Sequence, residues 1–241
     1  MYCELLSNPY PEVTVGRDVI EKIQLNRNPH WTVLAAILDS QSDPKQYLTN
    51  LKQLSNTNKS RVELANRFQD YKVEGYSLYH LTLTYKPYGK KYYSEEDINL
   101  FFRTFYLQHF LPYLLETNKY QRQWARRIQP ICLAFLDEHQ TVAKQLVVQS
   151  LAASGTQISY EFPLRLHHHA ILAIHKDTLQ KLLPLVGENT FAKGNFSHKV
   201  MTSALVSCDA KRLLYASKKM EKYPEFLSFT GLHEQLFQTN N

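Results

Sequence analysis

The stretch Leu166-His-His-His-Ala-Ile-Leu-Ala-Ile174 carries the strongest structural signal in the chain. An apolar run after a polar start is typical of a buried strand, and we expect a strand over residues 164–174. Alternate side chains of a strand share a face, so His167 and His169 point one way and His168 the other. Two imidazoles one strand step apart can share a divalent metal ion with a carboxylate from a neighbouring strand. The alternative is a polar strand end without function.

Further elements follow from the pattern on either side. Residues 76–85 alternate strictly and are rich in β-branched and aromatic side chains, which predicts a second strand. Ser94-Glu-Glu-Asp97 is a capping box that opens a helix reaching residue 114. Two more strands are expected over residues 128–136 and 201–207, and two more helices over residues 178–185 and 211–220. This order predicts the α+β class, with a central antiparallel sheet and flanking helices.

The first 75 residues have a different character. Helical spacing recurs over residues 31–38, 47–54 and 61–71, with a loop expected at 55–60. We therefore expect a mostly helical extension over residues 1–75 and a second domain over residues 76–241. The extension could bind duplex DNA, mediate oligomerisation or buttress the sheet.

Composition restricts the function classes. The 241 residues carry a formal net charge of +6, which favours a polyanionic partner such as nucleic acid. The three cysteines are widely spaced with no CxxC, which excludes a cysteine zinc knuckle and fits reduced thiols in the cytoplasm. A signal peptide and a long apolar run are both missing from the sequence, so no membrane partner is expected.

A basic segment with a tyrosine follows the last strand. On a helix over residues 211–220, Lys218 and Lys219 lie beside Tyr215, because positions three and four apart are neighbours. An ammonium group there would stabilise a phenolate and a phosphate together. The alternative is a basic amphipathic helix whose tyrosine only packs.

Three motifs in this order resemble the HUH endonuclease superfamily, in its replication-initiator branch. They are the strand His80-Leu-Thr-Leu-Thr84, the pair formed by His167 and His169, and Tyr215-Ala-Ser-Lys218. The middle residue of the histidine motif is His168, where the family usually has an apolar side chain. The tyrosine follows the histidines and is single, which favours a one-tyrosine replication initiator over a relaxase or a two-tyrosine enzyme. The resemblance covers residues 76–226.

The resemblance implies an RRM-like Rep nuclease fold and a specific chemistry. His167 and His169 would hold Mg²⁺ or Mn²⁺ against a scissile phosphate. Tyr215 would attack that phosphate to give a 5′-phosphotyrosine link and a free 3′-OH, with Lys218 orienting the phosphate. Such an enzyme nicks and rejoins single-stranded or hairpin origin DNA of a plasmid or phage during rolling-circle replication. The chain has no P-loop motif, so a host helicase would act with it, beside the host polymerase.

The third metal ligand and the DNA contacts are less sharply indicated. Glu138, after the strand at residues 128–136, is slightly preferred as the ligand over Glu161. Thr82 and Thr84 share a strand face and could line the floor of the site. Basic residues beside aromatic ones suit contact with a single strand, and the candidates are Lys86, Lys90, Lys91, Arg126, Arg127 and Lys219.

Other function classes stay open. A non-catalytic origin-binding protein on the same fold would bind DNA without a tyrosine-linked product. An HUH transposase or relaxase is a second alternative. A zinc hydrolase built on the histidines ranks last, since the sequence has no HExxH motif.

Overall fold

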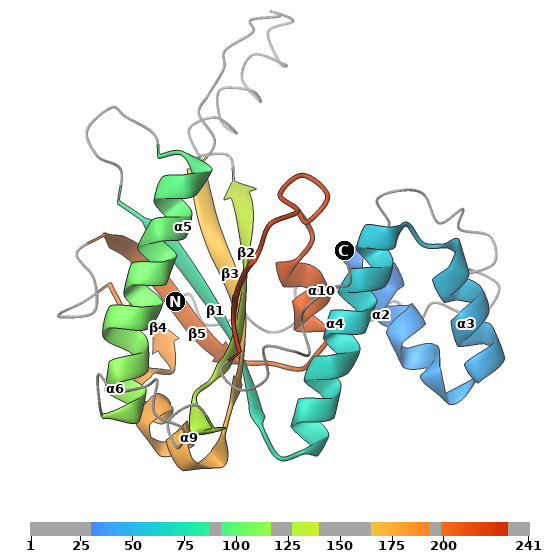
Figure 1. Ribbon diagram of the computed structural model, residues 1–241, viewed down its shortest axis with the longest axis horizontal. Helices are drawn as coiled ribbons and strands as arrows, with labels where there is room; N and C mark the ends of the chain where they lie inside the picture. Colours follow the sequence, from blue (N-terminus) through green and yellow to red (C-terminus); the bar gives the residue numbers. More distant parts are fainter. Residues whose placement is uncertain (1–29, 87–92, 117–126, 140–164, 193–198, 231–241) are drawn as a thin grey trace, which may run out of the picture.

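The chain folds as an antiparallel sheet with helices on both faces, the α+β class expected from the sequence (Figure 1). This computed structural model describes residues 30–86, 93–116, 127–139, 165–192 and 199–230. The candidates Lys90, Lys91, Arg126 and Glu161 lie outside the described residues. Within the described ranges, no helix is long and apolar enough to cross a membrane.

The sheet has six strands in the order β4-β5-β1-β3-β2-β6. The four strands predicted from the pattern are confirmed as β1 (Ser77–Tyr85), β2 (Ile131–His139), β3 (Arg165–Ile174) and β5 (Val200–Ser207). Two edge strands were not predicted, β4 (Gly187–Glu188) and β6 (Leu227–Phe229), because they are too short to show an alternating pattern. The histidine strand β3 is central, between β1 and β2.

One face of the sheet is covered by the helices after β1. The predicted capping box is confirmed: Ser94 Oγ accepts from the Asp97 backbone N–H at 3.2 Å, and Asp97 accepts from the Ser94 backbone N–H at 3.1 Å. The segment then runs as α5 (Glu95–Thr104), a π-helical turn η3 (Phe105–Phe110) and α6 (Leu111–Leu115). Pro112 has no N–H to donate, which favours the wider turn before it. Helix α9 (Lys176–Leu182), continued by the 3₁₀ turn η4 (Leu183–Leu185), covers the same face. Together these helices and the β1 side chains on this face form a first hydrophobic core.

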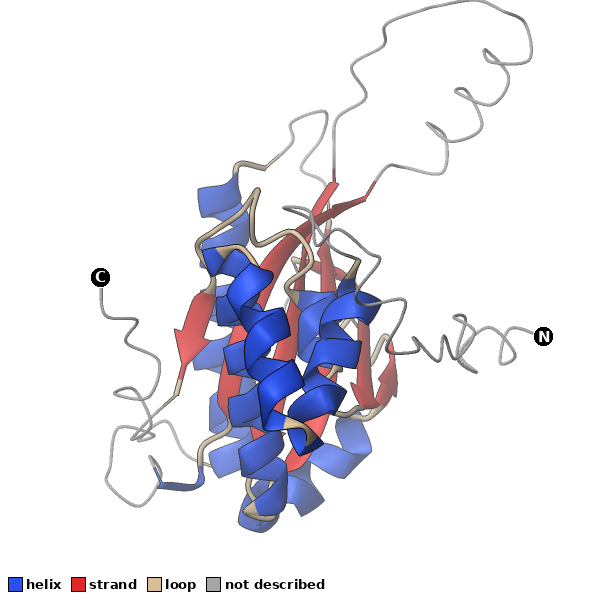
Figure 2. Cartoon of the chain, turned by 90° about the vertical axis from the view of Figure 1, so that its right-hand side faces the viewer, coloured by secondary structure: helices blue, strands red, loops and turns tan. Residues whose placement is uncertain are grey.

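The other face is covered by helices from before β1 and after β5 (Figure 2). They are α2 (Trp31–Asp39), α4 (Asn56–Val73) and α10 (Arg212–Ala216), while α3 (Pro44–Gln53) packs on α2 after a short 3₁₀ turn η2 (Ser40–Ser42). Leu34, Ile37 and Phe68 are fully buried in one core with the apolar side chains of β2 and β3 on this face. Full burial of such a side chain contributes roughly 1.5–3 kcal/mol. The helices before residue 75 therefore buttress the sheet.

The boundaries of two helices differ from the sequence prediction. The loop expected at residues 55–60 is wrong, because Ser55 caps α4 and the helix begins at Asn56. The last helix, expected over residues 211–220, ends at Ala216. Beyond it, the Lys218 backbone N–H donates to the Tyr215 carbonyl at 3.1 Å, a three-residue step that ends the α-helical hydrogen-bond ladder.

Candidate active site

Two histidines of β3 and an aspartate of β2 form a buried cluster. The strand register places Asp137 opposite His167, and both histidines face the side of the sheet that α10 covers. Asp137 Oδ2 lies 3.1 Å from His169 Nε2 and 3.5 Å from His167 Nε2, and the two Nε2 atoms are 3.2 Å apart. Asp137, His167 and His169 are 1%, 6% and 5% exposed. One ligand atom from each lies within 4.8 Å of the others, so the group could hold a metal ion.

The acidic member of this group is Asp137, and the expectation of Glu138 is corrected. Successive residues of β2 face opposite sides of the sheet, so Glu138 points away from the histidines. Its carboxylate accepts from the Tyr223 hydroxyl at 2.7 Å and from the Lys222 ammonium at 2.5 Å, with Lys219 at 3.5 Å.

The electrostatics of Asp137 suit a cation. Burial raises the pKa of its carboxyl, but hydrogen bonds from His169 and Lys218 outweigh burial and hold that pKa well below the ordinary value. Oδ1 accepts from the Glu138 backbone N–H at 2.8 Å. His167, His169 and the Lys218 ammonium converge on Oδ2. The carboxylate is therefore ionised, and the Lys218 ammonium is the positive charge paired with its Oδ2.

A hydrogen-bond chain from β1 and α10 reaches this cluster. The Arg212 guanidinium has only donors, so its Nε–H donates to Nδ1 of His80 at 3.2 Å. Burial, and then the charges of His169 and Arg212, put the pKa of His80 well below its ordinary value, so His80 is neutral. Its Nε2–H then donates to Nδ1 of His169 at 3.1 Å. Sequence reasoning quoted His80 in the first motif but gave it no role.

Thr82 offers His169 a hydrogen-bond partner at Nδ1, the ring nitrogen that does not face Asp137. A metal bound through Nε2 of His169 moves the ring hydrogen to Nδ1, which then needs an acceptor. Nε2 of His80 is a donor and would have to give up its bond to Nδ1, whereas Thr82 Oγ1 lies 3.1 Å from Nδ1 of His169 and can accept. Thr82 is thus confirmed on the floor of the site.

Replacing Thr82 with valine is expected to weaken metal binding about tenfold, because the acceptor is lost while shape and strand propensity are kept. The matched control is Thr84→Val on the same strand face, whose hydroxyl bonds to Thr202 instead. Titration calorimetry with Mn²⁺ would measure both, and equal affinities for the two variants would contradict this role.

His168 confirms the predicted alternation and points into the first core. Asn99 Oδ1 accepts from His168 Nε2–H at 3.0 Å, so Nδ1 accepts from the Tyr85 hydroxyl at 2.8 Å. Burial, with smaller effects of His167 and His169, lowers the pKa of His168 to about 3. The ring is therefore a neutral, satisfied core residue that fixes the other two histidines to the opposite face.

This buried imidazole predicts acid sensitivity. Between pH 7 and pH 5 the unfolded chain protonates His168, whose ordinary pKa is 6.5, while the folded chain does not. The unfolded state then binds more protons, so stability falls with falling pH, by about 2 kcal/mol for this residue. Urea unfolding at both pH values, with chelator present, should show that extra loss in the wild type relative to His168→Gln. Equal losses in both proteins would count against a neutral His168.

Tyr215 lies over the cluster of Asp137, His167 and His169. Its ring meets that of His169 edge-on, with centroids 5.3 Å apart. The Lys218 ammonium is 4.1 Å and the Arg212 guanidinium 4.4 Å from the ring centroid. Lys218 also contacts Asp137, so one cation joins the tyrosine to the acidic side chain. The predicted neighbourhood of Tyr215 and Lys218 is therefore present, although Lys218 lies beyond the end of α10.

The remaining basic candidates are spread over the sheet. Lys219 pairs with Glu138 on the opposite face, which corrects the expectation that it lies beside Tyr215. Lys86 is exposed just after β1, at the end of the sheet where Thr84 pairs with His167. Arg127 is exposed just before β2, at the far end of that strand from Asp137. Of the described DNA candidates, Lys86 and Lys219 thus lie at the histidine end of the sheet, and Arg127 does not.

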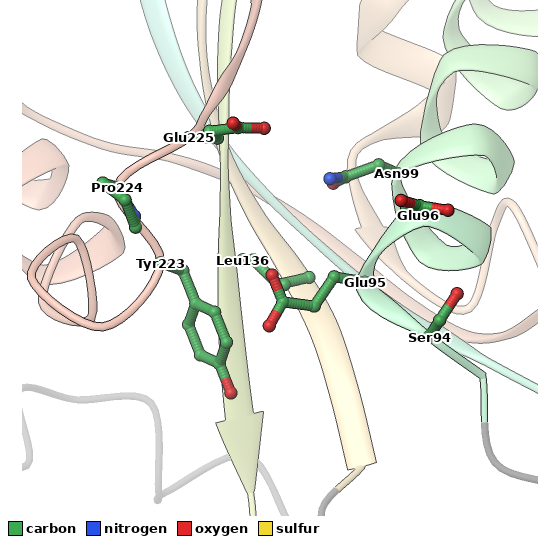
Figure 3. A pocket seen from close by; sticks show the side chains of 8 residues that line it. All are labelled: Ser94, Glu95, Glu96, Asn99, Leu136, Tyr223, Pro224 and Glu225. Atoms are coloured by element: carbon green, nitrogen blue, oxygen red, sulfur yellow. The ribbon is translucent and has the colours of Figure 1, made fainter.

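A pocket on the other face has the wrong charge for a phosphate. It opens between the start of α5, strand β2 and the segment after α10, and Leu136, Asn99, Tyr223 and three glutamates line it (Figure 3). Glu95, Glu96 and Glu225 would repel an anion. On the face of Tyr215, by contrast, Arg212 and Lys218 lie over the tyrosine ring and would attract an anion.

Comparison with protein-family models, curated proteins and solved structures finds no match to this chain.

Proposed function

We propose that this protein is a metal-assisted nickase of single-stranded DNA that uses Tyr215 as its nucleophile. The observation that carries the proposal is the Tyr215 ring, 5.3 Å from the His169 ring and flanked by Lys218 and Arg212. A phenol, a potential Lewis-acid site and two cations at one point suit transfer of a phosphoryl group.

The proposal includes a relationship to HUH replication initiators. The three motifs quoted from the sequence meet at one place, since β1 pairs with β3 and α10 packs on β3. The antiparallel sheet with flanking helices is compatible with that fold. On this basis the substrate is a single-stranded or hairpin origin, and the reaction starts rolling-circle replication of a plasmid or phage with a host helicase and polymerase.

The donor set fits a divalent metal. A carboxylate and two imidazoles leave coordination positions for water and a phosphate oxygen, as in sites for Mg²⁺ or Mn²⁺. Asp137, His167 and His169 would hold the ion. When bound, it would supply Lewis-acid polarisation of the scissile phosphate.

The chain's own residues account for the rest of the chemistry. The Tyr215 hydroxyl gives up its proton as its oxygen bonds to phosphorus. The bond from phosphorus to the 3′ oxygen breaks, and the 3′ oxygen takes up a proton, so the step is balanced. The products are a 5′-phosphotyrosine and a free 3′-OH. Lys218 and Arg212 offset the negative charge that collects on the phosphate oxygens. The covalent link keeps the phosphodiester energy, so the reverse reaction rejoins the strand.

The test is covalent capture by the full-length protein. Purified protein is incubated with Mn²⁺ and a pool of labelled single strands that contain hairpins, and products are separated on a denaturing protein gel. We expect a labelled protein band that needs the metal and disappears with chelator, and mass spectrometry should place the nucleotide on Tyr215. A retained gel shift on native gels without any covalent band would favour a non-catalytic DNA-binding protein.

A further inference from the structure

The helix that carries Tyr215 is too short to hold itself in place. α10 spans Arg212–Ala216, about one and a half turns, and an isolated helix of that length is not stable in water. The metal ligands, by contrast, are on the central strands of the sheet. The distance between the tyrosine and the metal-binding cluster must therefore be set by what packs on α10.

One buried side chain of α4 binds the end of this helix. Arg61 is 4% exposed, and its Nη2 donates to the Leu214 carbonyl at 2.6 Å. Its Nε donates to Ser217 Oγ at 3.1 Å, and its Nη1 donates to Asn58 at 2.8 Å. The Ser217 hydroxyl in turn donates a hydrogen bond to the Leu213 carbonyl.

This contact has the form of a helix C-cap supplied by another element. Leu214 is in the last turn of α10, and the Lys218 backbone N–H, four residues on, donates to the Tyr215 carbonyl rather than to that of Leu214. A cation there also matches the negative end of the helix dipole. Burial lowers the pKa of Arg61 to about 10, so the guanidinium stays charged at neutral pH. Its planar fork satisfies the Leu214 carbonyl on α10 and the hydroxyl of Ser217 just after it at the same time.

Helix α2 closes the other side of the tyrosine. The Trp31 ring meets the Tyr215 ring edge-on, with centroids 6.0 Å apart. A surface ion pair of 2.8 Å also joins Asp39 at the end of α2 to Lys211 just before α10. Exposed pairs of this kind contribute little, which makes Asp39 a suitable control.

We propose that Arg61 is the positioning residue for Tyr215, and that α2 and α4 are thereby an integral part of the nickase site. This assigns Arg61 on α4, with Trp31 on α2 beside the tyrosine, a positioning role beyond buttressing the sheet. The inference rests on the proposed function for its catalytic consequence, but the position of Tyr215 can be measured without any reaction.

The experiment uses the full-length protein with 3-fluorotyrosine placed at position 215. The ¹⁹F resonance is recorded without metal or DNA, and the single-turnover rate of adduct formation is measured at saturating DNA and Mn²⁺, well below the melting temperature. Arg61→Lys keeps a cation but loses the fork, and Ser217→Ala removes one acceptor. Asp39→Asn is the matched control, since it breaks the exposed contact between α2 and the start of α10.

We expect Arg61→Lys to shift or split the ¹⁹F resonance and to lower the rate at least tenfold, with the Kd for single-stranded DNA within twofold of wild type. Ser217→Ala should move the resonance less, with a severalfold slower rate, and Asp39→Asn should change neither. If Arg61→Lys does not fold, Ser217→Ala carries the test.

An unchanged resonance in both variants overturns the inference, whatever happens to the rate or the melting temperature. A wild-type protein that forms no adduct would refute the proposed function instead. In that case a shifted resonance would still support the positioning of Tyr215 by Arg61.

Discussion

Tyr215→Phe is expected to reduce covalent adduct and strand cleavage by on the order of 1,000-fold or more, to background. The change removes one oxygen, the atom that would bond to phosphorus. The melting temperature, the affinity for Mn²⁺ and the affinity for single-stranded DNA should stay close to wild type. The measurement is a single-turnover cleavage time course beside thermal unfolding and binding titrations.

The selectivity of this effect follows from how Tyr215 is held. The contacts found for it are contacts of the ring: edge-on to Trp31, His80 and His169, with Lys218 and Arg212 over the face. A phenylalanine ring can keep all of them. If the variant loses activity but still folds and binds, the missing Tyr215 hydroxyl must be needed for the reaction itself.

Tyr223→Phe is the matched control in the same segment. Its hydroxyl donates to Glu138 on the opposite face of the sheet, so its removal should leave cleavage within about twofold of wild type. If cleavage is retained in Tyr215→Phe and lost in Tyr223→Phe, the nucleophile is Tyr223, on the other face of the sheet.

The sequence predicts the frame of the site well because its signals are local. Strict alternation over residues 76–85 and the apolar run to Ile174 define β1 and β3, and the capping box defines the start of α5. Alternation alone also places His168 on the opposite face of β3 from His167 and His169. Each of these inferences needs only neighbouring residues, whose geometry is fixed by the period of the element.

What the sequence could not supply depends on contacts between distant segments. Apolar side chains occupy both faces of β2, so its pattern does not show which of Asp137 and Glu138 faces the histidines; the register of Asp137 against His167 does. The hydrogen bond at the end of α10 likewise joins distant segments, since Arg61 is 153 residues away from Leu214 in the chain. One available signal was missed, since His80 shares strand parity with Thr82 and Thr84.

Asp137→Asn is expected to weaken Mn²⁺ binding at least about 100-fold and to abolish the adduct. The substitution keeps the size of the side chain but removes the charge on which both histidines and Lys218 converge. Without metal, the variant should lose roughly 1.5–3 kcal/mol of stability, the usual contribution of hydrogen bonds to a charged group. Calorimetry and thermal unfolding with and without Mn²⁺ measure both effects.

Glu138 provides the control that decides which of the two carboxylates, Asp137 or Glu138, is the metal ligand. Glu138→Gln makes the same chemical change one residue further along β2, on the face away from the histidines. It should keep the Mn²⁺ affinity within about threefold and keep the rise in melting temperature on adding the ion, whereas Asp137→Asn should lose that rise. The opposite pattern would mean that Glu138 is the ligand and that β2 pairs with β3 in a register shifted by one residue. Since such a shift would turn every side chain of β2 to the other face, this pair of variants tests the sheet and the metal site together.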